Sequence, residues 1–156
     1  MANAVARKAS GPAVDVEALI RIAHEGYGPG AWHGPDLKAA LGDVTADLAF
    51  WRPGKGRHNI AEIALHHAYT VRAVCGRLTG ATPEAFVLEG EDWFEAPTEK
   101  TLSWPAIVEV VAAWQRKLDS AIRRFAKGDV EMADNAKPLD LVLGIACHAV
   151  YHAGQV

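Results

Sequence analysis

The sequence predicts an all-α domain, built as a four-helix bundle with the helices in up-down-down-up order. In several long stretches the apolar residues recur at alternating spacings of three and four, which places them along one side of a helix. Between these stretches the chain is rich in glycine and proline, and alternation of apolar and polar residues never persists long enough to indicate a strand.

Length and composition fit one domain. The chain has 156 residues, of which 50% are hydrophobic and 22% are charged, as in an ordinary globular protein. The net charge of -3, without a cluster of Lys and Arg, argues against binding to nucleic acid. No apolar run approaches the ~20 residues of a membrane span, and the start of the chain lacks the apolar segment of a signal peptide. We therefore expect a cytoplasmic protein that binds neither nucleic acid nor membranes.

The first helix is expected after a tail. Residues 1–14 show no periodicity, which predicts a flexible tail followed by a bundle domain over residues 15–156. Apolar residues at helical spacing predict the first helix over residues 15–26. A segment rich in glycine and proline then breaks this helix. A short helical pattern follows at 36–41, and residues 44–51 are predicted to form a turn.

The second helix has a clear start and end. Asn59 is placed to cap it, Glu62 completes the pattern of a capping box, and Gly80 stands where a C-terminal glycine is expected. Its seam is predicted to consist of Ile60, Ala64, His67, Val71, Val74 and Leu78. Residues 81–102 lack periodicity and contain prolines and a glycine, so they predict a long crossover to the third helix.

The third and fourth helices complete the bundle. The third is predicted to begin after Ser103 as its cap and to end at Gly128. The fourth follows Pro138. Their seams are Trp104, Ile107, Val111, Trp114, Leu118, Ala121 and Phe125 in the third, and Leu141, Ile145, His148, His152 and Gln155 in the fourth. The long connection between the second and third helices, with shorter ones elsewhere, favours the up-down-down-up order.

His148 and His152 occupy seam positions where leucine would be expected. Being four residues apart, they project from one face of the helix with Cβ atoms about 5 to 6 Å apart, so both imidazoles can reach one metal ion. Burying a polar imidazole is unfavourable unless it finds a partner. A metal ion would satisfy both rings, but ordinary hydrogen bonds within the core would also do so, and the pair alone leaves both interpretations open.

A third ligand is expected from the second helix, where His66 and His67 are adjacent. The two side chains cannot face the same way, because neighbouring helical residues are separated by about 100° around the axis. Periodicity favours His67, which falls on the seam, and directs His66 toward a flank. The spacing argument leaves the choice between them open.

Three segments resemble the DinB/YfiT-like superfamily over about residues 30–156. They are AWHGPDLKAAL, WRPGKGRHNIAEIALHH and CHAVYHAGQV. The resemblance implies an up-down-down-up bundle with a divalent metal ion, nickel or zinc, bound by His66, His148 and His152. It thereby selects His66 over His67. The position of His67 is usually aliphatic in the family, so this chain departs from the pattern there.

Three neutral imidazoles leave coordination positions open, as in catalytic metal sites. The resemblance implies a metal-dependent hydrolase or thiol-dependent transferase that acts on a small electrophilic molecule, with a low-molecular-weight thiol as a candidate second substrate. It also leads us to expect a homodimer. The alternative is a non-catalytic metal-binding or dimerising bundle. The sequence contains no recognisable Ser/His/Asp order or phosphate-binding loop and assigns no catalytic residue.

Four further residues have two interpretations each. Gln155 either hydrogen-bonds a metal-bound water or a ligand or is a polar residue near a helix end, and Glu62 either orients His66 or only caps the helix. His33 either reaches the site or packs in its loop, and Trp93 either lines the pocket mouth or anchors the crossover. Both cysteines, in apolar surroundings, are expected to be buried free thiols.

Overall fold

The computed structural model describes residues 15–94, 98–132 and 137–156. Within these ranges the chain forms six α-helices and no β-strand, so the all-α prediction is confirmed. The tail expected at residues 1–14 lies outside the described residues. None of the helices in the described ranges has the length and apolar character required to cross a bilayer.

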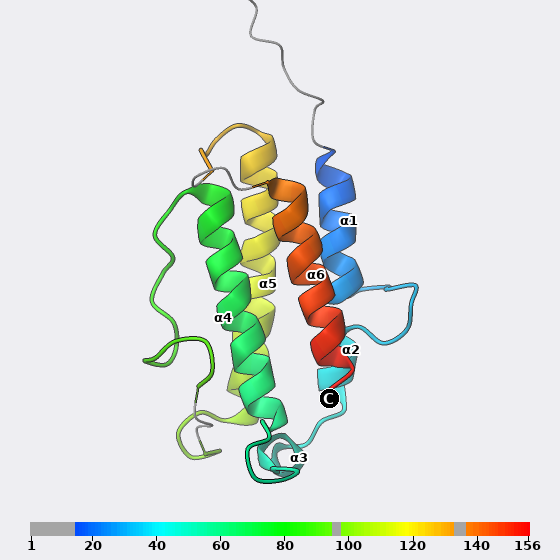
Figure 1. Cartoon of the computed structure of the whole chain (residues 1–156), viewed down its shortest axis with the longest axis vertical. Helices are drawn as coiled ribbons and strands as arrows, with labels where there is room; N and C mark the ends of the chain where they lie inside the picture. The colour runs from blue at the N-terminus through cyan, green and yellow to red at the C-terminus, as the bar shows by residue number, and fades with distance from the viewer. Residues whose placement is uncertain (1–14, 95–97, 133–136) are drawn as a thin grey trace, which may run out of the picture.

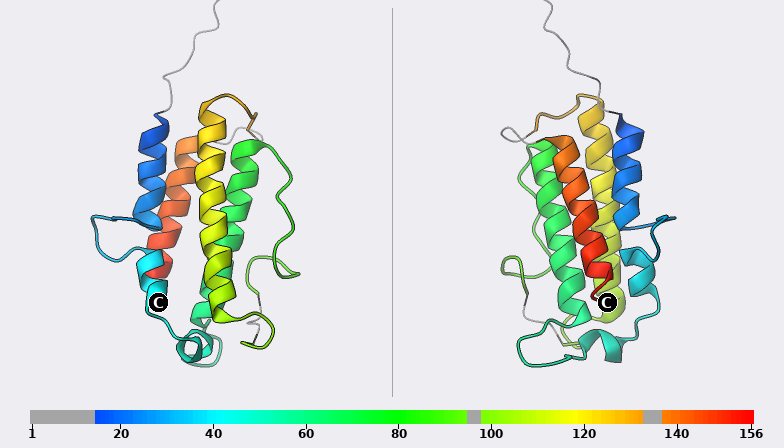
Figure 2. Two further views of the ribbon diagram at one scale, coloured as in Figure 1. Left: turned by 180° about the vertical axis from the view of Figure 1, so that it is seen from behind. Right: turned by 45° about the vertical axis from the view of Figure 1, so that its right-hand side comes forward.

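The four longer helices lie side by side (Figures 1 and 2). They are α1 (Val16–Gly26), α4 (Ile60–Thr79), α5 (Trp104–Ala126) and α6 (Pro138–Ala153). In Figure 1, α1 and α6 run down the page while α4 and α5 run up it. Each of the four contacts two others, since α4 and α1 both pack against α5 and α6. The contacts therefore form a closed ring around one core.

Two short helices close the lower end of the molecule in Figure 1. Helix α2 (Leu37–Gly42) packs against α6, and α3 (Ala46–Phe50) packs against α4. The sequence predicted only a turn where α3 forms. The Thr45 side chain caps this helix by accepting the backbone N–H of Leu48, a stabilisation that the five-residue pattern was too short to reveal.

The predicted helix boundaries are confirmed where capping residues specified them. The Asn59 side chain accepts the backbone N–H of Glu62, whose carboxylate accepts the Asn59 N–H in return. Gly80 ends α4 with a φ of 64°, in the left-handed region that favours glycine. Ser103 accepts the backbone N–H of Ala106 and starts α5. These local signals fix both ends of α4 and the start of α5, whereas α6 begins without a side-chain cap.

The predicted seams face the core except at Gln155, which is exposed and lies past the end of α6 at Ala153. Along α4 and α5 their apolar residues are almost all buried, although Ile60 and Phe125 are half-buried. The ten largest fully buried side chains include one imidazole, that of His67. His66 and His152 are also buried, so the bundle holds polar rings within a mainly apolar interior.

Helices α1 and α6 approach each other closely at Gly26. A Cβ atom at this position would lie 2.7 Å from the Ala146 carbonyl oxygen and 2.8 Å from the Ala149 Cβ. Because one of these atoms is backbone, the helices would have to move apart. We expect Gly26→Ala to lower the free energy of unfolding by about 1 to 2 kcal/mol, overpacking being offset in part by the better helix propensity of alanine. Thermal unfolding measures this as a fall in Tm of about 2 to 8 °C.

Gly42 provides a matched control. It is the last residue of α2, as Gly26 is of α1, but a Cβ there meets nothing within 4 Å. Gly42→Ala should leave Tm unchanged or raise it slightly. Equal effects of the two substitutions would contradict the close approach of α1 to α6.

Candidate metal centre

Three histidines from two helices converge between α4 and α6. The Nε2 atom of His148 lies 3.1 Å from Nε2 of His66 and 3.2 Å from Nε2 of His152. All three rings offer a ligand atom within 4.8 Å of the others. His66 and His152 are buried and His148 is half-buried. The residues named by the family resemblance are thus brought together, and their binding of a metal stays a prediction.

The outer nitrogens of two of these rings are hydrogen-bonded to oxygen acceptors. Nδ1 of His66 lies 3.2 Å from the carbonyl oxygen of Asp92 and 3.0 Å from its Oδ1. Nδ1 of His152 lies 2.6 Å from Oε1 of Gln155. Since oxygens of this kind only accept, each Nδ1 carries the proton and donates it. In the neutral rings each Nε2 then presents a lone pair to the point that the three histidines share.

This arrangement fits a divalent cation. A proton on Nε2 of His148 could be donated to only one of the two facing lone pairs, which would leave the other without a partner. A cation at the shared point would be bound by all three nitrogens. Bonds of about 2.0 to 2.1 Å place neighbouring nitrogens about 2.8 to 3.0 Å apart in octahedral geometry and about 3.3 to 3.4 Å apart in tetrahedral geometry. Both separations in the cluster lie between these values. Imidazole ligands suit zinc and nickel.

Burial keeps the rings of His148 and His152 neutral. It lowers the pKa of His148 to about 4, with further lowering by the neighbouring His152 and His66 imidazoles. Burial also lowers the pKa of His152, against the effect of its hydrogen bond to Gln155. A metal ligand must be deprotonated. At neutral pH both rings are therefore neutral, and the hydrogen bond to Gln155 leaves Nε2 of His152 without the proton that would compete with a cation.

His67 also reaches the cluster, but on the other side of His148. Its Nδ1 lies 3.2 Å from Nδ1 of His148. Periodicity therefore placed His67 correctly on the seam, while the inference that His66 points toward a flank was wrong. Helix α4 presents both residues toward α6, because its first half is buried over consecutive positions from Ala61 to Ala68. A fully buried helical segment has no flank facing solvent.

The connection between α4 and α5 supplies two residues that the sequence did not identify as partners of the histidines. Asp92 has a φ of 59° and directs its backbone carbonyl as well as its carboxylate to His66. The Trp93 indole stacks on His66 at 3.9 Å between ring centroids and on His58 at 3.7 Å. Without periodicity in this segment, no sequence pattern indicated where its side chains would lie.

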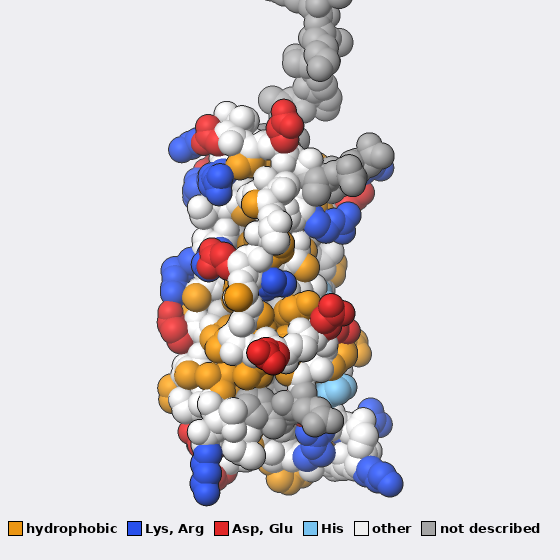
Figure 3. Space-filling view, turned by 90° about the vertical axis from the view of Figure 1, so that its left-hand side faces the viewer, with side chains coloured by type: hydrophobic (Ala, Val, Ile, Leu, Met, Phe, Trp, Pro, Cys, Tyr) orange, Lys and Arg blue, Asp and Glu red, His pale blue; other side chains and the backbone are white. Residues whose placement is uncertain are grey.

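Aromatic side chains anchor this connection to α4. Phe94 is buried, and its ring stacks on Phe86 and meets Tyr69 edge-on. Figure 3 faces this side of the molecule and shows hydrophobic side chains gathered across it. Trp93 therefore belongs to an anchored segment and also contacts the cluster through His66. It combines the anchoring role with the role of lining a pocket.

The remaining candidates lie as follows. Gln155 accepts the Nδ1–H of His152 and so orients that ring. Glu62 forms the capping box and binds Arg52 through both carboxylate oxygens. His33 Nε2 lies 2.8 Å from the backbone carbonyl of Glu25, to which it donates, which supports its loop-packing role.

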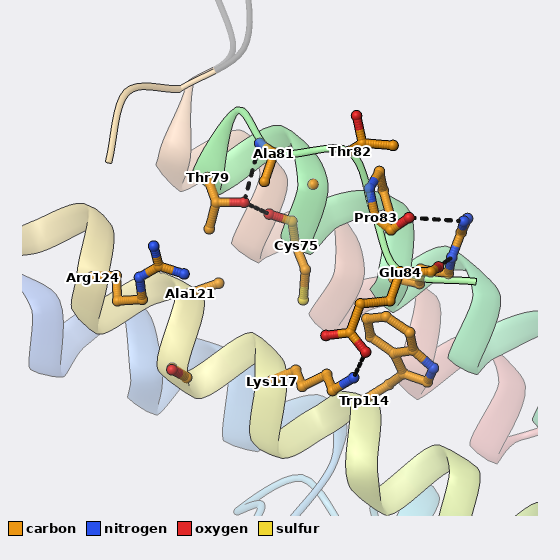
Figure 4. A pocket seen from close by; sticks show the side chains of 13 residues that line it. Cys75, Thr79, Ala81, Thr82, Pro83, Glu84, Trp114, Lys117, Ala121 and Arg124 are labelled. Carbon is orange, nitrogen blue, oxygen red and sulfur yellow. Dashed lines mark hydrogen bonds and ion pairs between the residues drawn. The ribbon is translucent and has the colours of Figure 1, made fainter. Parts of the chain in front are cut away.

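Two pockets border α4. One, of about 580 Å³, includes Trp93 and His58 in its lining but none of the three clustered histidines, although Trp93 also stacks on His66. The other, of about 260 Å³, lies between α4 and α5 and contains none of the histidines (Figure 4). Cys75 lines this second pocket, where burial raises the pKa of its thiol to about 12 and suppresses the nucleophilic thiolate. Cys147 is exposed, so its predicted burial was wrong: it lies on the outer face of α6.

Comparison with known proteins gives one family match. The model described as the DinB superfamily matches residues 31–156, a range that includes the three clustered histidines. No curated protein and no solved structure matches the chain.

Proposed function

Because this chain belongs to the DinB superfamily, we propose that it is a metal-dependent enzyme whose divalent ion, nickel or zinc, is bound by His66, His148 and His152. The proposed reaction is hydrolysis, or transfer of a thiol, on a small electrophilic molecule. The observation that carries the proposal is the convergence of three Nε2 atoms, 3.1 and 3.2 Å apart, with the outer nitrogens of two rings already held by acceptors.

For the fold we propose the up-down-down-up bundle, with the crossover between α4 and α5. The directions of the four long helices in Figure 1 and their ring of contacts support this topology. We further propose a cytoplasmic homodimer, and analytical ultracentrifugation of the purified protein tests the oligomeric state.

The residues of the chain would divide the work as follows. The three imidazoles hold the ion, while Asp92 and Gln155 keep two of the rings in the orientation and tautomer required. When bound, such an ion lowers the pKa of a coordinated water or thiol and polarises a carbonyl group. Trp93 covers one face of the His66 ring and shields it from bulk water on that side.

The pocket beside Trp93 offers room for a substrate. Its volume of about 580 Å³ is within the range of small-molecule sites. The side chains of Lys55 and Arg57 contribute positive charge to its lining, where the Arg52 guanidinium is paired with the Glu62 carboxylate. These charges favour a substrate that carries an anionic group at a distance from its reacting atom.

Elemental analysis and titration test the metal. Protein purified without chelator should contain one equivalent of metal, and metal-free protein should bind nickel or zinc. At a free metal concentration about 1,000 times Kd, binding should stabilise the fold by about 4 kcal/mol, or roughly 8 to 16 °C in Tm. A protein that neither retains nor takes up metal contradicts the proposal.

An activity screen separates catalysis from metal binding alone. The metal-loaded protein is incubated with activated esters, and with α,β-unsaturated carbonyl compounds plus a small thiol. Product formation that requires added metal supports the enzyme. Stoichiometric metal without turnover of either class supports the alternative of a non-catalytic metal-binding bundle.

A further inference from the structure

His67 is a buried imidazole with an unsatisfied nitrogen. Its side chain is 1% exposed, and its Nε2 has no hydrogen-bond partner among the described residues. An unpaired polar atom in the interior is unfavourable, and a leucine at this seam position would avoid it. Packing alone therefore does not account for a histidine here. Its one polar contact is with His148, Nδ1 to Nδ1 at 3.2 Å.

The two facing nitrogens share one proton, and its location determines what His148 can do. If His67 donates, Nδ1 of His148 is the acceptor, and the neutral His148 ring carries its own proton on Nε2. That proton would point at the lone pairs of His66 and His152. If instead His148 donates from Nδ1, its Nε2 is free and completes the set of three lone pairs.

We propose that His67 is a positioning residue for His148: its Nδ1 accepts the Nδ1–H of His148 and holds the Nε2 lone pair of that ring toward His66 and His152. The inference rests on the proposed function, because a metal ion is what that lone pair would bind.

Each of the three clustered histidines then has an outer acceptor of its own. His67 serves His148 as Asp92 serves His66 and as Gln155 serves His152. Outer hydrogen bonds of this type orient ligand rings and raise their basicity. The acceptor for His148 must come from the interior of the bundle, because Nδ1 of His148 faces α4. His67 lies on the seam of α4, and when its proton is on Nε2, its Nδ1 has a lone pair that can accept this hydrogen bond.

A direct ligand role for His67 fits the geometry less well. Its Nδ1 faces Nδ1 of His148, whereas the Nε2 atoms of His66 and His152 face the opposite nitrogen of that ring. Ligands of one ion would have to gather at the same nitrogen of His148. The distances assign that place to His66.

Two substitutions of His67 test the positioning role, because one is expected to raise the Tm and weaken metal binding while the other is expected to lower the Tm and preserve binding. His67→Leu removes the acceptor and also the unpaired nitrogen, so the metal-free protein should have a higher Tm while the Kd for nickel rises about 10- to 100-fold. His67→Asn places Oδ1 on Cγ where histidine has Nδ1, so it should restore a Kd close to that of the wild type. Its amide group adds buried donors, so the Tm should fall. Calorimetric titration with nickel and thermal unfolding measure both quantities.

Control variants and one measurement on the natural chain complete the design. Val74→Ala truncates the same seam two turns away and should lower Tm without changing Kd, whereas His66→Ala should abolish binding. Long-range ¹H–¹⁵N spectra of the nickel-free and zinc-loaded wild type should show His148 protonated at Nδ1 and His67 protonated at Nε2, which decides the question even if His67→Asn does not fold.

Several results would overturn the inference. A Kd for His67→Leu within twofold of the wild type would do so, as would spectra with the proton on Nδ1 of His67. Complete loss of binding in His67→Leu with retention in His66→Ala would make His67 a ligand instead. A wild-type protein that binds no nickel or zinc would refute the proposed metal site itself, which is a separate outcome.

Discussion

Replacing His148 by alanine is expected to abolish stoichiometric metal binding. His148 is the central member of the cluster, since its Nε2 lies within 3.2 Å of both other Nε2 atoms. Loss of an outer hydrogen bond to a ligand weakens metal affinity about 10- to 100-fold. Removal of a ligand should exceed this, and we expect the Kd for nickel or zinc to rise by about 100-fold or more. Elemental analysis and calorimetric titration measure the change.

His33→Ala is the matched control for this experiment. His33 is a histidine outside the cluster, and its Nε2 donates to the backbone carbonyl of Glu25. Its substitution should leave one equivalent of metal on the protein. Retention of metal by His148→Ala with unchanged affinity would show that the three rings do not form the site.

Acidification is expected to destabilise the metal-free protein between pH 6.5 and 4. The folded state lowers the pKa of His148 from 6.5 to about 4, chiefly by burial. In this window the unfolded chain binds a proton at His148 that the folded protein does not bind, so the free energy of unfolding falls as the pH falls. The full shift would correspond to about 3 kcal/mol, and because His148 is only half-buried, solvent screening reduces the expected loss to about 1 to 2 kcal/mol. Burial lowers the pKa values of His67 and His152 as well, which acts in the same direction.

Urea unfolding of the metal-free protein at several pH values between 7 and 4 measures this effect. His148→Gln lacks the titrating group and should lose less stability over the same range. Ordinary carboxylates stay mostly ionised down to about pH 5, so the loss of stability between pH 6.5 and 5 separates the histidine effect from general acid denaturation. A free energy of unfolding that is constant from pH 7 to 4 would contradict neutral buried imidazoles.

Regular features of the fold were predictable because their signals are local. Asn59, Glu62 and Gly80 mark the two ends of α4, and each performs in the structure the role that its position predicted. The i, i+4 spacing of His148 and His152 likewise required only one helix. Periodicity could not choose between His66 and His67, because the first half of α4 is buried all round and has no polar face to set its orientation.

The outer partners of the site could be predicted only in part. Gln155 lies three residues after His152, just past the end of α6, and a role at the site was one of its two interpretations, although its partner there is the His152 ring. Asp92 lies 26 residues after His66 in the sequence and Trp93 is the next residue, and both are in a segment without periodic structure. Their contacts depend on how the connection folds back onto α4, which is a tertiary property.

The three clustered histidines and the residues that surround them come from different parts of the fold. Helices α4 and α6 hold the histidines rigidly, while the connection that supplies Asp92 and Trp93 is fixed mainly by the aromatic contacts of Phe86 and Phe94. Insertions or deletions between these two phenylalanines should therefore be tolerated by the helical scaffold while reshaping the approach to the centre. The segment is the natural place to randomise when one scaffold is to be diversified toward new substrates.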